Sequence, residues 1–302
     1  MIVFASSITA PDIYERYAAP GIRRAAEPDS EVLPFQAAGS IFRSYNLILD
    51  QVAARDDVEA LVLIHQDAEI VDAGFCRELR RALADPEVGV VGCVGAVDVR
   101  SIAWWEGSVT WASFNHRFEE LGGGELHGFT WDRDDRPPYA HLGEVDTVDG
   151  FVLALAPWTI RNVRFDESLG ALHGYDFDFC LQVREAGRKV VTADLRVMHH
   201  HSLELVSDPQ TWVEAHIRIS EKWDGRMPGV GVAGGDWRQR ARRAEAEASL
   251  ARTQAVAAMH QADARKGDLE RQVEEMTGSI SWRITEPLRR LNALRRNLRR
   301  PG

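Results

Sequence analysis

The stretch "LVLIHQDAEI", residues 61–70, begins as a buried strand and then turns polar. Leu61 to Ile64 form an unbroken aliphatic run, and His65, Gln66 and Asp67 follow it directly. A short apolar run that ends in polar residues is typical of a strand buried on both faces. Taken alone, the three polar residues fit a turn capped by Asp67 better than they fit a binding site.

Similar apolar runs span residues 2–5, 31–35, 60–64 and 88–94, and helical patterns lie between them. Ser40 is the predicted N-cap of one helix, and Asp85-Pro86 ends another. Strands that alternate with helices predict an α/β fold with a mostly parallel central sheet and helices on both faces. Ligands bind at the carboxyl ends of the strands in such sheets, and Asp67 lies at one of these ends.

Shifts in composition divide the rest of the chain. Residues 101–147 are acidic and rich in Trp and Gly, and we expect them to form an insertion over the sheet edge of a domain that spans 1–205. We expect a packing helix and linker at 206–235. A long Ala/Arg/Glu-rich helix with a weak coiled-coil seam is predicted at 236–276, and a basic amphipathic tail at 277–302.

Composition excludes several classes of protein. The chain has 302 residues, 45% of them hydrophobic, which suffices for a packed core. Its net charge is −10, although residues 277–302 carry seven Arg and one Glu. An acidic body argues against general nucleic-acid binding, because phosphate attraction requires a basic face. The basic tail favours contact with an anionic surface or an acidic partner.

Cysteine usage and hydropathy indicate a cytoplasmic protein. Cys76, Cys93 and Cys180 lie far apart and form no CxxC pair, so neither a disulfide framework nor a thiolate zinc site is predicted. No stretch reaches the roughly 20 apolar residues of a membrane-spanning helix. The N-terminus is typical of a first strand rather than a signal peptide.

A run of histidines, "HHHS" at 199–202, follows the last predicted strand, on the side of the sheet where Asp67 lies. Side chains alternate along a strand, so at most two of the three histidines can face one ion. Imidazole and carboxylate together form a reasonable Mn²⁺ site. By itself the run fits a surface position equally well.

Two further motifs carry carboxylates. "GYDFDF" opens a helix, and the spacing of Asp176 and Asp178 lets only one of them point into a pocket. "TVDGF" places Asp149 and Gly150 at the mouth of a strand. Considered separately, these motifs fit solvated helix acids and a plain turn better than a site.

The order of the motifs resembles that of inverting glycosyltransferases of the GT-A fold, in the family 2-like group that includes bacterial rhamnosyl- and polysaccharide-building enzymes. The resemblance covers residues 1–205. From "VDGFVLAL" to "EAGRKVV" the sequence has an Asp-Gly strand, a Phe-Asp-Glu segment, an Asp-x-Asp helix that ends in Ala-Gly, and a strand that leads to histidine. "SYNLILDQVA" resembles the helix after the donor loop, and "HQD" falls where the family has Asp-x-Asp.

This resemblance implies roles for individual residues. Asp67 takes the metal-binding position and Asp176 the catalytic base. An ungapped count from Gly187 gives His200 the histidine that completes the metal site, with His199 and His201 as alternatives. The implied cofactor is Mn²⁺ or Mg²⁺. The implied donor-binding residues are Ser6, Asn46, His65, Gln66 and Asp67, and the implied acceptor-binding residues are Asp149, Gly150 and Trp105.

The expected reaction moves a sugar from a nucleotide-diphosphate sugar to a carbohydrate acceptor, such as a lipid-linked or surface polysaccharide. Two positions depart from the family pattern: His65 replaces the first Asp, and Tyr175 replaces the acidic residue before Asp176. A nucleotidyltransferase is one alternative, but the loop "SSITAPDIY" lacks its Gly-rich basic character. A degenerate scaffold that acts through its helical extension is the other, and the intact aspartate and histidine set argues against it.

The C-terminal segment "GSISWRITEPLRRL" resembles a tail of bacterial surface-polysaccharide glycosyltransferases. Its leucine stripe among arginines predicts peripheral contact with the anionic inner face of a membrane. Packing against the protein itself or a partner subunit is the alternative. The C-terminal helices also offer a homodimer contact.

Overall fold

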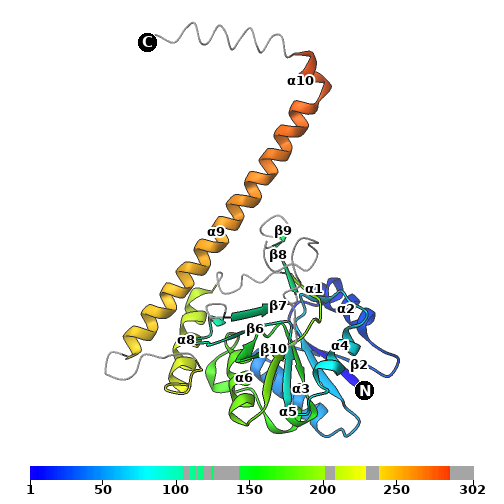
Figure 1. The fold of residues 1–302 in the computed structure, drawn as a ribbon, viewed down its shortest axis with the longest axis vertical. Helices are drawn as coiled ribbons and strands as arrows, with labels where there is room; N and C mark the ends of the chain where they lie inside the picture. The colour runs from blue at the N-terminus through cyan, green and yellow to red at the C-terminus, as the bar shows by residue number, and fades with distance from the viewer. Residues whose placement is uncertain are drawn as a thin grey trace. The chain divides into compact units, whose positions relative to one another are not determined.

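The computed structural model describes residues 1–104, 143–200, 208–228 and 238–285, together with the backbone of short strands at 109–112, 114–118 and 124–125 (Figure 1). The chain forms two compact units, residues 1–254 and 255–302. The predicted insertion tip, His201 and the tail beyond residue 285 lie outside the described residues.

A seven-stranded sheet in the order β10-β13-β5-β12-β3-β1-β2 forms the centre of the first unit. Strands β1, β2, β3, β5 and β13 run in one direction, whereas β10 and β12 run against them. The strands are β1 (Ile2–Ile8), β2 (Glu31–Gln36), β3 (Ala60–Ile64), β5 (Val88–Gly92), β10 (Gly143–Val145), β12 (Val152–Leu155) and β13 (Lys189–Thr192). The predicted α/β fold with a mostly parallel sheet is confirmed.

Burial along the strands follows their place in the sheet. Every residue of β3 is buried, as expected for a strand with neighbours on both edges and cover on both faces. Strand β2 lies at the edge, and its residues alternate between half-buried and exposed. Leu61 to Ile64 therefore form part of the core that positions the polar turn after them.

Helices α3 (Ile41–Ala53), α4 (Phe75–Ala82), α5 (Pro157–Asn162) and α6 (Tyr175–Glu185) contact the strands of this sheet (Figure 1). The Ser40 hydroxyl accepts a hydrogen bond from the amide of Arg43 at 3.1 Å, which caps α3 as predicted. Pro157 begins α5. Gly187 follows α6 with a φ of 78°, a left-handed conformation that glycine adopts at low cost.

The segment after β1 forms two helices that the sequence patterns did not predict, α1 (Pro11–Arg16) and α2 (Ala18–Ala25). Helix α2 packs against β4 (Ala68–Ile70) at close range. A Cβ atom on Gly21 would lie 2.5 Å from the amide nitrogen of Ile70, so this contact requires glycine.

The first unit also contains two smaller sheets. One has the order β11-β6-β7 and the other the order β4-β14-β8-β9. Their remaining strands are β6 (Val94–Val97), β7 (Val109–Ala112), β8 (Phe114–Phe118), β9 (Gly124–Glu125), β11 (Thr147–Val148) and β14 (Val197–His200). Part of the predicted 101–147 insertion is therefore strand, and β10 joins the main sheet.

Among the described residues that follow the sheets, the helices are α8 (Pro209–Lys222), α9 (Arg238–Gly278) and α10 (Ile280–Ile284). The Asp208 side chain caps α8, and Trp212, Ile219 and Trp223 are buried. The first turns of α9 also bury Ala246 and Leu250 in the first unit. Within the described part of the chain, no helix combines the length and apolar character that crossing a membrane requires.

Candidate active site and metal centre

The polar turn after β3 is paired with the strand that carries the histidines. Residues 65–67 lead from β3 into β4, and β4 pairs with β14. In this register His199 stands opposite Ala68, and the amide of His200 donates a hydrogen bond to the carbonyl of Asp67 at 2.9 Å. The pairing therefore brings His199 next to Asp67.

His65, Asp67 and His199 form a group that can hold a metal ion. One ligand atom from each lies within 4.8 Å of the others. His65 Nδ1 is 3.8 Å from Asp67 Oδ1, and His199 Nε2 is 3.6 Å from the same oxygen. Two imidazole nitrogens and a carboxylate oxygen around one point suit a divalent transition metal such as Mn²⁺.

The electrostatics of the group favour a cation. Burial lowers the pKa of His65 to about 4, so its imidazole is neutral and has a lone pair to donate. Burial opposes ionisation of Asp67, but His199 and His65 outweigh it and lower the pKa of this carboxyl. A neutral His65 imidazole and an ionised Asp67 carboxylate are protonation states in which these two residues can bind a metal ion.

His200 lies elsewhere. Its ring stacks on Tyr17 with centroids 3.8 Å apart, and its Nε2 is 3.5 Å from Glu69 Oε2. Neighbouring residues of a strand face opposite sides, so only one of His199 and His200 can face Asp67. The ungapped count from Gly187 selected the neighbour of the histidine that the structure brings to Asp67.

The two predicted site carboxylates meet at the turn between β11 and β12. The amide of Gly150 donates a hydrogen bond to Asp176 Oδ2 at 2.8 Å, and the amide of Phe151 donates to Asp149 Oδ1 at 3.2 Å. The Phe151 ring stacks on His199, with centroids 4.5 Å apart. This turn therefore links Asp176, at the start of α6, to the metal-ligand group.

Asp176 has the electrostatic character of a proton acceptor. Burial raises its pKa to about 7, and the neighbouring Asp149 contributes to the rise. Burial also raises the pKa of Asp149. A carboxylate with a raised pKa holds a proton more strongly than an ordinary aspartate, which is the property of a general base.

Asp178 has a different surrounding from Asp176. Its carboxylate accepts hydrogen bonds from Trp223 Nε1 at 2.8 Å and Gln182 Nε2 at 2.7 Å, and it pairs with Lys222 Nζ at 2.7 Å. Asp178 therefore fastens α6 to α8, while Asp176 contacts the turn of the candidate site.

Residues 10–220 match the model of a glycosyltransferase-like family. The chain belongs to this glycosyltransferase family. The streptomycin biosynthesis protein StrF of Streptomyces griseus is 30% identical over 220 residues, which are 72% of this chain and 73% of StrF. The O-antigen biosynthesis protein RfbC of Myxococcus xanthus is 27% identical over 172 residues, which are 55% of this chain but 13% of RfbC.

A solved structure with similarity to the chain is the mannosyltransferase PcManGT from Pyrobaculum calidifontis, in complex with GDP-Man and Mn²⁺. It is 13% identical, the match covers 94% of this chain and 81% of PcManGT, and the TM-score is 0.43. The predicted enzyme class is confirmed by the family match: the protein is a glycosyltransferase.

Two predicted donor-binding residues of the glycosyltransferase hold loops in place. Gln66 Oε1 accepts hydrogen bonds from the amides of Thr9 and Ala10, each at 2.9 Å. The Asn46 side chain donates to the carbonyl of Phe165 and accepts from its amide, both at 2.9 Å. Gln66 thus anchors the loop after β1, and Asn46 anchors the segment after α5.

Ser6 was predicted to bind the donor and Trp105 to bind the acceptor. Ser6 is buried within β1. Trp105 lies outside the described residues. Sequence reasoning treated Tyr175 only as a departure from the family pattern, yet its hydroxyl lies 2.6 Å from His65 Nε2. Both positions depart from the family pattern, since Tyr175 replaces an acidic residue and His65 replaces an Asp. These two departures were the signal in the sequence that the residues form a pair.

Proposed function

We propose that this glycosyltransferase moves a sugar from a nucleotide-diphosphate sugar to a carbohydrate acceptor with inversion at the anomeric carbon. Asp176 is the general base, and His65, Asp67 and His199 form a metal site. The observation that carries the proposal is the turn at 149–151, which holds Asp176 through Gly150 and stacks on His199 through Phe151. Base and metal ligands are thus supported by one structural element at the carboxyl end of β3.

The proposed reaction is a single displacement. The acceptor hydroxyl oxygen attacks the anomeric carbon, and its proton passes to Asp176. The bond from the anomeric carbon to the diphosphate oxygen breaks on the opposite face, and the nucleoside diphosphate leaves with the electron pair. The Gly150 amide donates a hydrogen bond to Oδ2 of Asp176, and this bond restricts the orientation of the carboxylate. One displacement at carbon gives the inverted product.

A divalent cation bound by the three ligand residues supplies positive charge that stabilises the departing diphosphate. We favour Mn²⁺ over Mg²⁺, because two of the three ligands are imidazoles. Mg²⁺ prefers oxygen ligands in near-ideal octahedral geometry. The protein's own part is to hold two imidazoles and one carboxylate around one point and to bury Asp67 and His199.

The test combines a panel of nucleotide sugars with candidate acceptors in the presence of Mn²⁺ or Mg²⁺. The two readouts are the release of nucleoside diphosphate and the anomeric configuration of the product, determined by NMR. We expect Asp176→Asn to lower kcat by about 10²–10⁴-fold while donor binding persists. Asp50→Asn is the control, because Asp50 is an exposed α3 carboxylate paired with Arg164. Wild-type turnover by Asp176→Asn, or a product with retained configuration, would overturn the proposal.

For the acceptor side, we propose that the tail at 277–302 brings the enzyme to an anionic membrane surface where lipid-linked acceptors are found. The sequence supports this through seven Arg and a stripe of Leu, and residues 286–302 lie outside the described part of the chain. Co-sedimentation of the full chain with vesicles of anionic phospholipid is expected to be lost when residues 277–302 are removed. Unchanged co-sedimentation contradicts this role.

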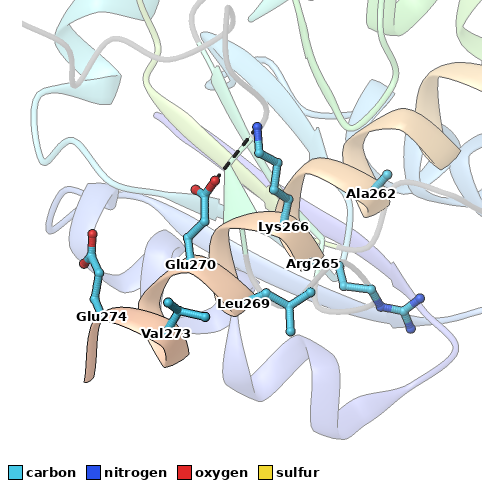
Figure 2. Close-up of a pocket in the computed structure, with 7 residues that line it drawn as sticks. All are labelled: Ala262, Arg265, Lys266, Leu269, Glu270, Val273 and Glu274. Carbon is cyan, nitrogen blue, oxygen red and sulfur yellow. Dashed lines mark ion pairs between the residues drawn. The ribbon is translucent and has the colours of Figure 1, made fainter. Parts of the chain in front are cut away.

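We also propose that α9 joins two copies of the chain. Within the second unit, one face of this helix carries Ala262, Lys266, Leu269 and Val273 (Figure 2). The same face continues to Met276 at the alternating spacing of three and four residues that coiled coils use. Leu269 and Val273 are 55% and 52% exposed, so their apolar surface is available to a partner helix.

Charges beside this face favour a parallel second copy. If Leu269 occupies a d position, Arg265 is at g and Glu270 at the following e, and these two positions meet between the chains of a parallel pair. An antiparallel pair brings e positions together and sets Asp263 against Glu270, which are both acidic. Lys266 falls at an a position and pairs with Glu270 of its own helix at 3.9 Å (Figure 2). A single charged a position restricts register at some cost in stability.

Sedimentation equilibrium of the full chain tests this contact. We expect a dimer, a monomer for Leu269→Lys with Val273→Lys, and an unchanged dimer for the control Glu275→Lys on another face of the helix. Leu269→Cys is expected to form a disulfide between copies, because equivalent d positions face each other only in a parallel, in-register pair. A monomeric wild type, or a dimer without this crosslink, contradicts the proposal.

A further inference from the structure

Tyr175 lies on the far side of the His65 ring from the metal-ligand group. Its Oη is 2.6 Å from His65 Nε2, whereas the other ring nitrogen, Nδ1, is the one 3.8 Å from Asp67 Oδ1. His65 is therefore placed between a tyrosine hydroxyl and the point where the three ligand atoms converge.

This arrangement selects one form of the imidazole. A neutral histidine carries one ring proton, and a nitrogen that binds a cation must be the one without it. Nδ1 lies on the side of the ligand group and must be unprotonated to bind a cation there, so the proton belongs on Nε2, from which it is donated to Tyr175 Oη. A hydrogen bond on the second ring nitrogen fixes both the tautomer and the orientation of a metal-binding histidine.

We infer that Tyr175 is a positioning residue, which holds His65 as the Nε2–H tautomer with Nδ1 directed at the divalent cation. The inference rests on the proposed metal site and deepens it. It assigns a role to a residue that departs from the family pattern, and it explains why His65 and Tyr175 occur together.

The residues around Tyr175 fix its position beside His65. The tyrosine is buried, and its ring makes edge-on contacts with Phe42 and Tyr45, with centroids 6.0 and 5.7 Å apart. Its hydroxyl occupies the space beside Gly150, where an added Cβ would lie 2.0 Å from Oη. Gly150 therefore makes room for Tyr175, and its amide holds the adjacent Asp176. One glycine thus supports both the positioning tyrosine and the proposed base.

The test measures the binding of Mn²⁺ to the full chain, by calorimetry and by the electron paramagnetic resonance signal of free Mn²⁺. We expect Tyr175→Phe to weaken binding by about 10–100-fold, the usual effect of losing a hydrogen bond to a metal-binding histidine. Tyr45→Phe is the matched control. The Tyr45 hydroxyl is buried beside Tyr175 and has no hydrogen-bond partner among the described residues, so its removal is expected to leave the affinity unchanged.

A second readout follows the proton itself. The ¹⁵N shifts of the His65 ring are expected to show the Nε2–H tautomer in the wild type and a mixture of tautomers in Tyr175→Phe. Equal Mn²⁺ affinity of wild type and Tyr175→Phe, or a wild-type proton on Nδ1, overturns the positioning role and leaves the metal site standing. A wild-type protein that binds no Mn²⁺ overturns the metal site and this role with it.

Discussion

The amide of Gly150 donates a hydrogen bond to Asp176 Oδ2 at 2.8 Å, so a residue of the turn after β11 orients a carboxylate on α6. The two residues are 26 positions apart in the sequence. The turn also contains Phe151, which stacks on His199. The same turn therefore supports the proposed base and one of the proposed metal ligands, and changes in this turn are expected to affect both.

Gly150→Ala tests this dependence. Its new methyl group would meet Tyr175 Oη, so the tyrosine must move and release His65. We expect a loss of about 1–3 kcal/mol of unfolding free energy, typical of overpacking, together with weaker Mn²⁺ binding. Gly267→Ala, inside α9, is the control and is expected to leave Mn²⁺ binding unchanged, because its Cβ meets only the end of the Arg271 side chain at 3.9 Å. Wild-type Mn²⁺ affinity in Gly150→Ala would refute the contact.

The pH dependence of turnover follows from Asp176. Burial raises its pKa to about 7, and the protonated acid cannot accept the acceptor's proton. We expect kcat/KM to rise as the pH increases through about 7. Asp149→Asn removes a like charge and is expected to move this rise to lower pH. A rise centred near pH 4, where an ordinary aspartate titrates at about 3.9, contradicts the assignment.

Asp178 is expected to contribute to stability. Its buried carboxylate pairs with Lys222 and accepts a hydrogen bond from Trp223 Nε1. Asp178→Ala leaves Trp223 Nε1 without its acceptor, whereas Lys222 keeps its pair with Asp166 at 2.7 Å, and we expect the variant to cost about 1–3 kcal/mol in chemical denaturation. Asp50→Ala, which breaks the exposed pair with Arg164, is expected to cost less than about 1 kcal/mol. Equal losses in the two variants would show that the α6–α8 anchor is not important.

His216 is expected to make stability depend on pH. The residue is fully buried on α8, and burial lowers its pKa to about 4 from the usual 6.5. The unfolded chain therefore binds a proton that the folded chain does not, so this contribution is complete above pH 6.5 and is lost as the pH falls towards 4. We expect His216→Leu to show a smaller loss of unfolding free energy between pH 6.5 and 4 than the wild type. Parallel curves would contradict the buried neutral state.

Local patterns were sufficient to predict much of the sheet and its helices. Strand β3 matches its aliphatic run, and α3 begins after the capping Ser40. Strand β12 runs antiparallel to its neighbours β3 and β5. Local sequence does not predict this direction, because it depends on which strands pair in the folded sheet. Helix α2 contains Gly21, which favours a loop on local grounds, but the close backbone of β4 requires glycine there.

The same distinction applies to the site. Asp67, Asp149 and Asp176 could be selected because each belongs to a motif with a fixed place in the strand and helix order. The choice between His199 and His200 depends on the register in which β14 pairs with β4. Counting residues along the chain gives no information about this register. The two departures from the family pattern single out His65 and Tyr175, but these residues are 110 positions apart, and the distance and orientation of their contact come from the folded chain.

Metal-dependent sugar transfer is tested most directly by nucleoside diphosphate release from the active nucleotide sugar, measured during an Mn²⁺ titration after treatment with EDTA. The account predicts that EDTA abolishes release by the wild type and that Mn²⁺ restores it. Asp67→Asn should stay inactive at Mn²⁺ concentrations that saturate the wild type, whereas Glu69→Gln, two residues further along, should be restored. Full release in EDTA, or normal restoration of Asp67→Asn, would contradict the account.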